Sequence, residues 1–463
     1  MSMVKKARVW IGSMLLIAVV AAAVIYRPDQ GARIGAGVAA HNLCSAVFVA
    51  GLDPEATFNE LVRPIIGRPF DAMVHYRVDR TNKSVETNFA HLFHARAAFT
   101  PGYGCRLEFE HTPPAPAART LLPAPAEDGF APSDPVTSRD SAINAALDQV
   151  FNEHPGQSIK DVKAVVIVKD GHVVAERYAR GFGVDTPLLS YSVAKSFTNA
   201  LLGILVRQGR LRVDQPVGAP EWQAANDPRA HLTIEDLLRM RSGLAVKEDA
   251  NGFNPVARME YLHDDMAAYA AQFPLSRPIG TEWDYTSGNT LILNRLLGHT
   301  VGGGAVGMRD FAEKELLIPA RLSDVTMEFD GSGVFMGASY VYAPARTYAR
   351  FGQLYLDDGV APDGQRILPE GWVDWSRRST LGSTYGAGFW TNDGSDSFTK
   401  WRVAHGFPKD GFFASGFLGQ RIYIIPSAKL VIVRFGYSRP PDFGMEDDLA
   451  LIAAAINGYA SKP

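Results

Sequence analysis

The chain has 463 residues, of which 46% are hydrophobic and 21% are charged, a globular composition with room for one large domain and a smaller one. Its formal net charge is −3, and the sequence contains no cluster of five or more basic residues. This balance excludes the basic surface that nucleic-acid binding requires. The sequence also offers no set of metal ligands at a recognised spacing, so we expect neither a metal nor a cofactor.

An apolar run follows a short basic segment at the N-terminus. Lys5, Lys6 and Arg8 precede an uncharged stretch from Val9 to Tyr26. At ~1.5 Å per residue a helix of this length spans about 27 Å, close to a bilayer core. Basic residues before it would keep that end in the cytoplasm. We therefore expect residues 1–30 to anchor the chain in the inner membrane, with the body in the periplasm or outside the cell. A cleaved signal sequence and a secreted body is the alternative.

The two cysteines are Cys44 and Cys105. In the oxidising compartment that export implies, such a pair favours one disulfide, with two unrelated buried thiols as the alternative. The disulfide would close a small segment, residues 36–112, with strand-like stretches at 72–78 and 105–109. A Pro/Ala-rich stretch, residues 113–137, follows and indicates an extended linker.

Residues 138–463 form the expected large domain. Its predicted elements are a helix at 142–151, a hairpin of strands 164–168 and 173–175, a mostly helical middle with a capping box at 233–236, a second hairpin of strands 421–425 and 430–435, and a helix at about 445–459. Strands from both ends of the domain would build one antiparallel sheet, and the helical middle would pack beside it. The fold class is therefore α+β.

Ser192-Val193-Ala194-Lys195 is the most informative stretch of the chain. Apolar residues recur at helical spacing from Phe197 onwards, so Ser192 would lie at a helix N-terminus, where free N–H groups favour a negative oxygen. Lys195 lies three residues later on the same face and would point at the serine hydroxyl. This geometry suits a serine nucleophile. A chance match is the alternative, since Ser-x-x-Lys is a common pattern.

Tyr285-Thr286-Ser287 is the second candidate, placed between a turn and an apolar helix. Beside Lys195, the pKa of the Tyr285 phenol would be lowered by the cation, and the phenolate could take the proton of Ser192. Ser287 would form a hydrogen bond in the cleft. A packed aromatic residue next to a turn is the alternative.

The third candidate is the glycine-rich stretch from Phe412 to Gln420, which enters the penultimate strand. Glycine lets a substrate approach the backbone closely, so we expect Ser415 and Gly416 to border the cleft. The amide of Phe417, together with that of Ser192, could form an oxyanion hole. A glycine-containing bulge at the start of a strand is the alternative.

These three motifs, in this order, resemble those of the penicillin-recognising serine hydrolases. That family includes class C β-lactamases, D-Ala-D-Ala carboxypeptidases, related esterases and 6-aminohexanoate-dimer hydrolases. The likeness covers about residues 140–460 and is carried by residues 190–198, 236–244, 280–289 and 345–356. It implies a β-lactamase/transpeptidase-like fold and an acyl-enzyme mechanism without a cofactor, in which Ser192 attacks and Lys195 and Tyr285 share the proton transfer.

The sequence departs from the family pattern at two positions. Ser287 stands where the tyrosine motif often has Asn. The third motif is usually Lys or His, then Thr or Ser, then Gly. Ala414-Ser415-Gly416 has the right position without the cation, whereas Lys409-Asp410-Gly411 has the lysine but lies further upstream. We prefer Ala414-Ser415-Gly416, and its missing cation favours ester or short-amide substrates over β-lactams.

We therefore expect an exported serine hydrolase that acts on a small-molecule ester or amide. Two alternatives remain. One is a catalytically silent penicillin-binding-like receptor or scaffold, and the other is a true β-lactamase or D-Ala-D-Ala carboxypeptidase.

Overall fold

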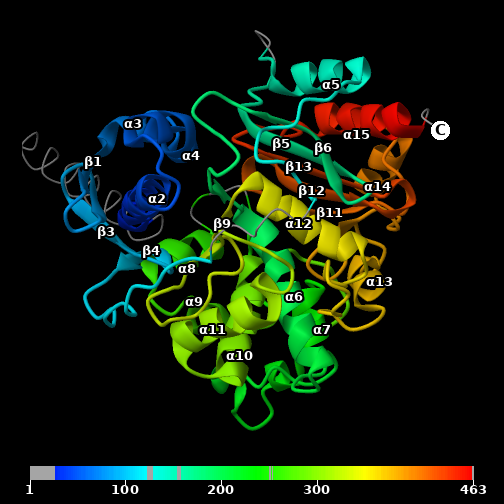
Figure 1. Cartoon of the computed structure of the whole chain (residues 1–463). Coiled ribbons are helices and arrows are strands. Elements are labelled where there is room, and N and C mark those ends of the chain that lie inside the picture. The colour runs from blue at the N-terminus through cyan, green and yellow to red at the C-terminus, as the bar shows by residue number, and fades with distance from the viewer. Residues whose placement is uncertain (1–26, 123–128, 154–157, 250–251, 253, 461–463) are drawn as a thin grey trace, which may run out of the picture.

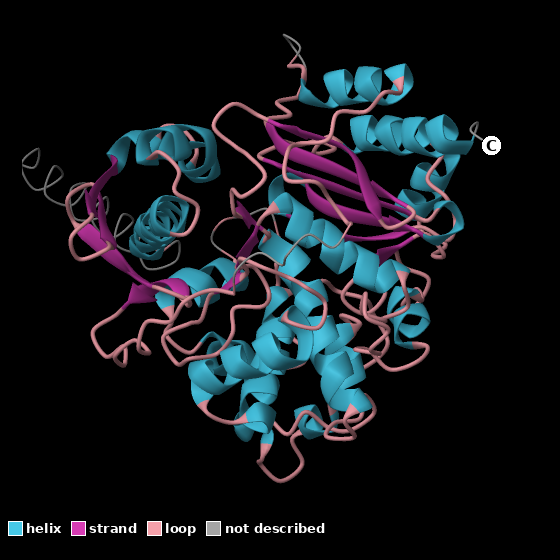
Figure 2. Ribbon diagram, viewed as in Figure 1, coloured by secondary structure: helices cyan, strands magenta, loops and turns pink. Residues whose placement is uncertain are grey.

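A computed structural model describes residues 27–122, 129–153, 158–249, 252 and 254–460. Figure 1 shows a small N-terminal unit beside a larger domain, which has a sheet with flanking helices above a mostly helical part. The expected α+β class is confirmed, since antiparallel strands and helices form separate layers (Figure 2).

A six-stranded antiparallel sheet joins the two ends of the large domain. Its order is β10-β11-β12-β13-β5-β6. The strands are β5 (Val162–Lys169), β6 (His172–Tyr178), β10 (Trp390–Thr391), β11 (Phe412–Gly416), β12 (Gln420–Ile425) and β13 (Leu430–Gly436). β13 from the C-terminal hairpin pairs with β5 from the N-terminal hairpin, with Ile432 opposite Ile167. The two predicted hairpins thus lie side by side in one sheet, with β6 at its edge.

Helices cover both faces of this sheet. The terminal helices α5 (Ser141–Phe151) and α15 (Met445–Ala460) lie on one face, and α12 (Ala345–Leu356) packs on the other (Figure 1). Along β5, Val165 and Ile167 belong to the core under the terminal helices, whereas Val166 and Val168 belong to the core on the opposite side. Because both faces are covered, β5 is apolar almost throughout.

The helical part holds the segments that carry the first two motifs. Its helices are α6 (Ala194–Arg207), α7 (Ile234–Leu238), α8 (Pro255–Leu262), α9 (Met266–Ala271), α10 (Ser287–Val301) and α11 (Gly304–Ala312). Two short helices, α13 (Trp372–Arg377) and α14 (Ser397–Ala404), lie later in the chain. The capping box predicted at Thr233 and Asp236 is confirmed at the start of α7. A three-stranded sheet, β7 (Leu188–Leu189), β9 (Val341–Ala343) and β8 (Thr326–Met327), leads into the nucleophile segment.

The N-terminal unit is a long helix packed on an antiparallel sheet. The helix α2 (Pro28–Phe48) is followed by α3 (Pro54–Thr57), α4 (Arg63–Ile66) and the strands β1 (Val74–Asp79), β2 (Ser84–Phe89), β3 (Phe93–Thr100) and β4 (Gly104–Glu108). The sequence predicts strands here but not α2. This helix is rich in small residues and buried along most of its length between the sheet and α8, so it lacks an amphipathic period.

A disulfide joins Cys44 of α2 to Cys105 of β4, with 6.1 Å between the two Cα atoms. It therefore fastens the helix of the N-terminal unit to the last strand of its sheet. The predicted linker boundaries, 113 and 137, fall between the end of β4 and the start of α5. The predicted apolar segment at residues 9–26 lies outside the described residues. Across the part of the chain that is described, no helix has the length and apolar character needed to cross a membrane.

Candidate active site

Ser192 lies in a tight turn at the entrance of α6. Residues Tyr191–Val193 form a short 3-10 turn, and α6 begins only at Ala194. Ser192 is therefore just outside the α-helix rather than at its first position. Tyr191 has φ +42°, which is uncommon for a residue other than glycine and is a frequent feature of functional sites. The turn presents Ser192 at a partly exposed position, whereas the next residues are buried.

Lys195 is the centre of the polar contacts. Its Nζ donates to Ser192 Oγ at 2.8 Å, to Ser287 Oγ at 2.9 Å and to the carbonyl oxygen of Ala338 at 3.0 Å. The side chain is only 2% exposed. Three acceptors match the three hydrogens of an ammonium group and fix its direction. The helical spacing thus places Lys195 as the sequence analysis expects.

Burial lowers the pKa of Lys195, while the nearby carboxylates of Glu248 and Glu260 act in the opposite direction. Burial is the largest of these influences. A lysine with a lowered pKa is a neutral amine in a larger fraction of molecules near pH 7 than a free lysine is. The neutral amine can accept the proton of Ser192.

The predicted lowering of the Tyr285 pKa is wrong. Burial raises the pKa of this phenol well above its usual value, and Glu248 raises it further, whereas a hydrogen bond with Ser192 acts the other way. Desolvation of the phenolate is the largest influence on this pKa. Nζ of Lys195 lies over the Tyr285 ring, 4.9 Å from its centre. Tyr285 therefore stays a protonated phenol near neutral pH and is not available there as the base that takes the proton of Ser192.

The third motif lies against the nucleophile turn. Ser415 and Gly416 end strand β11, and Phe417 begins a short turn before β12, so this segment is a strand of its own and not only the entry to the next. A Cβ atom on Gly416 would lie 2.4 Å from the Ser190 carbonyl oxygen and 3.0 Å from the Ser192 nitrogen. Only glycine allows this approach.

The backbone at the end of β11 is therefore adjacent to Ser192. The ring of Phe417 meets that of Tyr191 edge-on at 5.5 Å and is 49% exposed.

Lys409 lies at the other end of β11. The neighbouring carboxylate of Asp410 accepts hydrogen bonds from the backbone nitrogen and Oγ of Ser427, at 2.6 and 2.9 Å, in the turn between β12 and β13. The strand from Phe412 to Gly416 is about 13 Å long, and Lys409 lies before its start. The Lys409-Asp410-Gly411 alternative is thus remote from the nucleophile.

Two glutamates beside the site, Glu248 and Glu260, belong to none of the sequence motifs and were not predicted from the sequence. Glu248 Oε2 accepts from the backbone nitrogen of Ser287 at 2.5 Å and so helps to hold the start of α10. Glu260 Oε1 accepts from Ser339 Oγ at 2.6 Å, next to the Ala338 carbonyl, and burial raises its pKa to about 7. Both come from the segment between α7 and the tyrosine loop. Only the fold brings them to Lys195.

Aromatic rings flank Tyr285. The Tyr285 ring lies 5.6 Å from Trp390 and 5.5 Å from Tyr385, and Trp283 lies 6.2 Å from Trp390. Trp283 and Trp390 are half-buried. They form an apolar wall beside the phenol.

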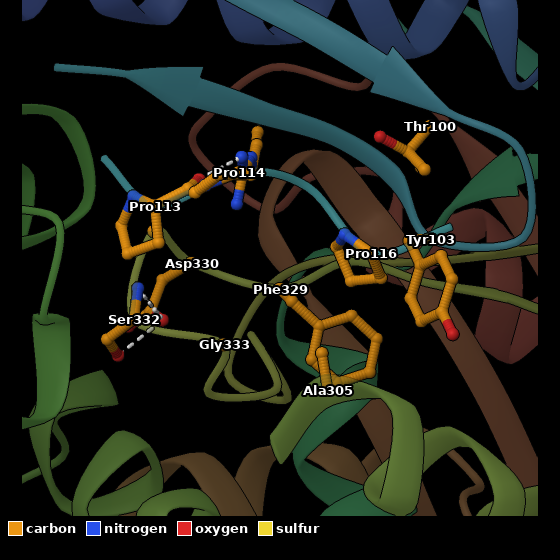
Figure 3. A pocket seen from close by; sticks show the side chains of 13 residues that line it. Thr100, Tyr103, Pro113, Pro114, Pro116, Ala305, Phe329, Asp330, Ser332 and Gly333 are labelled. Carbon is orange, nitrogen blue, oxygen red and sulfur yellow. Dashed lines mark hydrogen bonds between the residues drawn. The ribbon is translucent and has the colours of Figure 1, made fainter. Parts of the chain in front are cut away.

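The cavity in Figure 3 lies elsewhere, at the seam between the N-terminal unit and the large domain. Linker residues Pro113, Pro114 and Pro116 line it together with Tyr103 and Phe329. Its lining includes neither the serine, the lysine nor the tyrosine of the candidate site. Within the described ranges, no group of three or more His, Cys, Asp or Glu side chains could hold a metal ion.

Comparisons with known proteins identify sequences similar to this chain. The sequence model of a family described as Beta-lactamase matches residues 147–456. The chain is 26% identical over 346 residues to a 6-aminohexanoate-dimer hydrolase of Paenarthrobacter ureafaciens, covering 70% of this chain and 84% of that protein. It is 27% identical over 324 residues to penicillin-binding protein 4 of Amycolatopsis lactamdurans, covering 62% of this chain and 82% of that protein.

Among solved structures, a putative 6-aminohexanoate-dimer hydrolase from Bacillus anthracis has a similar fold. The TM-score is 0.56 at 20% identity, over 66% of this chain and 81% of the other. This likeness bears on the fold alone.

Proposed function

Because the chain belongs to the β-lactamase family and is a serine hydrolase, we propose that it cleaves neutral esters or short amides through an acyl-enzyme on Ser192. One observation carries the proposal: the buried Nζ of Lys195 lies 2.8 Å from Ser192 Oγ. A nucleophile and a base in hydrogen-bond contact are the minimum for this chemistry.

The proposed first step forms the acyl-enzyme. The neutral amine of Lys195 takes the proton of Ser192 while Oγ attacks the substrate carbonyl carbon. The negative oxygen of the tetrahedral intermediate is stabilised by the amides of Ser192 and Phe417. The protonated phenol of Tyr285 donates its proton to the leaving oxygen or nitrogen and regains one from Lys195. Ser287 keeps the lysine directed at the serine.

The second step releases the product. Water attacks the acyl carbon and transfers a proton to the same Lys195–Tyr285 pair, and the ester bond to Ser192 breaks. The serine recovers its proton and the acid leaves. No redox step is involved, and the same two groups serve as base and acid in both halves of the reaction.

The proposed preference for neutral substrates rests on charge. Ala414 occupies the position where the family's third motif usually has a cation, and Lys409 lies at the far end of β11. The apolar wall of Trp283, Tyr385 and Trp390 favours an uncharged, bulky group beside Tyr285. The resemblance to a 6-aminohexanoate-dimer hydrolase keeps short amides among the candidates.

We also propose that the enzyme works outside the cytoplasm. The Cys44–Cys105 disulfide supports an oxidising compartment, and the basic residues and apolar run of the first 26 residues support export. Membrane anchoring and secretion after cleavage are distinguished by cell fractionation and by the N-terminal sequence of the mature protein.

Labelling of Ser192 tests the proposed chemistry. The full chain is incubated with a fluorophosphonate or a p-nitrophenyl ester and analysed by mass spectrometry. We expect a covalent adduct on Ser192 and turnover of the ester. If neither an adduct nor turnover is observed, the result would support a silent receptor instead. Faster turnover of β-lactams than of esters would support a β-lactamase.

A further inference from the structure

A buried carboxylate of the large domain is held by three residues of the N-terminal unit. Glu328 is 0% exposed. Its Oε1 accepts from Ser45 Oγ and from the backbone nitrogen of Cys105, both at 2.7 Å. Its Oε2 lies 3.1 Å from His41 Nε2. We call Ser45, Cys105 and His41 the Glu328 socket. A buried carboxyl group needs hydrogen-bond partners, since burying an unpaired polar group is costly.

The disulfide and a glycine shape this socket. Cys105 is bonded to Cys44, the neighbour of Ser45, so the disulfide holds together the α2 and β4 sides of the socket. Gly104 has φ +71°, and a Cβ there would lie 2.5 Å from Glu328 Cγ. A side chain at this position would displace the glutamate.

Glu328 also holds the loop that carries an acceptor of Lys195. Its backbone nitrogen donates to the Tyr340 carbonyl at 3.2 Å, and its carbonyl accepts from the Met336 nitrogen at 2.8 Å. These bonds close the loop at residues 336–340. Within that loop, the carbonyl of Ala338 accepts from Lys195 Nζ.

Further contacts tie the same loop to the nucleophile turn and to the N-terminal unit. Ser190 Oγ donates to the Ser339 carbonyl at 3.2 Å and accepts from the Val341 nitrogen at 3.0 Å. On the other side, the His41 ring packs edge-on against Tyr340 with 4.3 Å between ring centres. The loop therefore lies between the Glu328 socket and Lys195.

We propose that Glu328 is a positioning residue and that the N-terminal unit, through the Glu328 socket, sets the direction of the Lys195 amine. The proposal rests on the proposed role of Lys195 as base. When the loop is held, the Ala338 carbonyl and Ser287 Oγ fix the position of the Lys195 amine, so that it points toward Ser192. Without the socket, the loop loses its link to the N-terminal unit through Glu328, and Lys195 reaches the serine in fewer molecules. The family match covers residues 147–456, so Glu328 and the loop lie inside the matched region, whereas the three socket residues lie before it.

The test uses the full chain and three variants. Glu328→Ala removes the contacts of this side chain with Ser45, Cys105 and His41. Glu328→Gln keeps an oxygen that can accept from Ser45 and Cys105. Glu86→Gln is the matched control, because Glu86 belongs to the N-terminal unit, as the socket residues do, but pairs with Arg77 at the surface. The measurements are kcat and KM for a p-nitrophenyl ester, the rate of Ser192 modification by a fluorophosphonate, and thermal unfolding.

We expect Glu328→Ala to lower kcat and the labelling rate about tenfold or more with KM changed less than twofold. Glu328→Gln should recover part of both rates, and Glu86→Gln should match the wild type. A purely structural role would lower Tm and the active fraction but leave kcat per labelled site unchanged, which would overturn the proposal.

A milder variant covers the case in which Glu328→Ala does not fold. Ser45→Ala removes one donor to Oε1, and we expect the labelling rate to fall about two- to fivefold with KM unchanged. A wild-type labelling rate in folded Ser45→Ala would then overturn the proposal. Failure of the proposed function is distinguishable, because in that case the wild-type protein itself would show no adduct on Ser192.

Discussion

The Nζ atom of Lys195 lies over the face of the Tyr285 ring, 4.9 Å from its centre. A cation in this place is attracted by the ring, which favours the charged amine. Burial acts against it and is the larger influence, since the pKa of Lys195 is lowered overall while that of Tyr285 is raised. Near neutral pH the lysine is therefore the group with a fraction of its molecules free to accept a proton, whereas the tyrosine keeps its proton and can only donate it.

The first prediction is a rising pH profile. At low pH Lys195 is protonated and cannot accept the serine proton, so kcat/KM should be small and should rise as the amine loses its proton. Because burial lowers the pKa of Lys195, the rise should be centred below the value of about 10.4 for a free lysine. Steady-state rates on a neutral ester across the pH range check this. A profile that falls over this range would contradict a lysine base.

Replacing the nucleophile gives the second prediction. Ser192→Ala removes the atom that attacks the carbonyl, and we expect hydrolysis to be abolished and fluorophosphonate labelling to disappear. Circular dichroism and Tm should match the wild type, because Ser192 is partly exposed at the site opening and its loss leaves no buried cavity. A variant that keeps more than a few per cent of the ester activity would exclude Ser192 as the nucleophile.

The third prediction concerns the shared proton path. Lys195→Ala and Tyr285→Phe should each lower turnover about 10²-fold or more, the scale of lost acid–base catalysis. The double variant should lose much less than the product of the two effects, because the groups act in one path. Kinetics of the four proteins under one set of conditions measure the coupling. Simple multiplication of the two losses would refute a shared path.

The fourth prediction concerns the disulfide. Cys44 and Cys105 are 61 residues apart in the chain, and closing such a loop stabilises proteins by roughly 2–4 kcal/mol. We expect the Cys44→Ala, Cys105→Ala double variant to lose stability of this order in urea unfolding. Thiol titration of the native protein should find no free thiol. Two free thiols would show that the pair is not formed.

The sequence predicts the part of the site whose residues are close together in the chain. Ser192 and Lys195 are three residues apart, and helical geometry alone brings them to one face. The two hairpins were predictable because Asp170-Gly171 and Pro426 mark turns between apolar runs, and the structure pairs β5 with β13 as one sheet.

What the sequence could not supply comes from distant segments. Glu248, Glu260 and the Ala338 carbonyl reach Lys195 only through the fold. The direction of the Tyr285 pKa was missed for the same reason, since desolvation depends on everything packed around the phenol.

The last prediction concerns substrate charge. A β-lactam or a peptide with a free carboxylate needs a cation in the cleft to fix that group. Ala414-Ser415-Gly416 offers none next to Ser192, and Lys409 is held at the opposite end of β11 by the contacts of Asp410 with Ser427. Lys195 is itself occupied by three acceptors in the site.

We therefore expect kcat/KM for p-nitrophenyl butyrate to exceed that for nitrocefin by at least about tenfold, or ~1.4 kcal/mol in transition-state stabilisation. Ala414→Lys restores the family's cation at this position and should raise the nitrocefin value selectively, with Ala414→Met as the uncharged control of similar length. Equal efficiency of the wild-type enzyme on both substrates would contradict the assignment. It would mean that another cation of this chain reaches the substrate carboxylate.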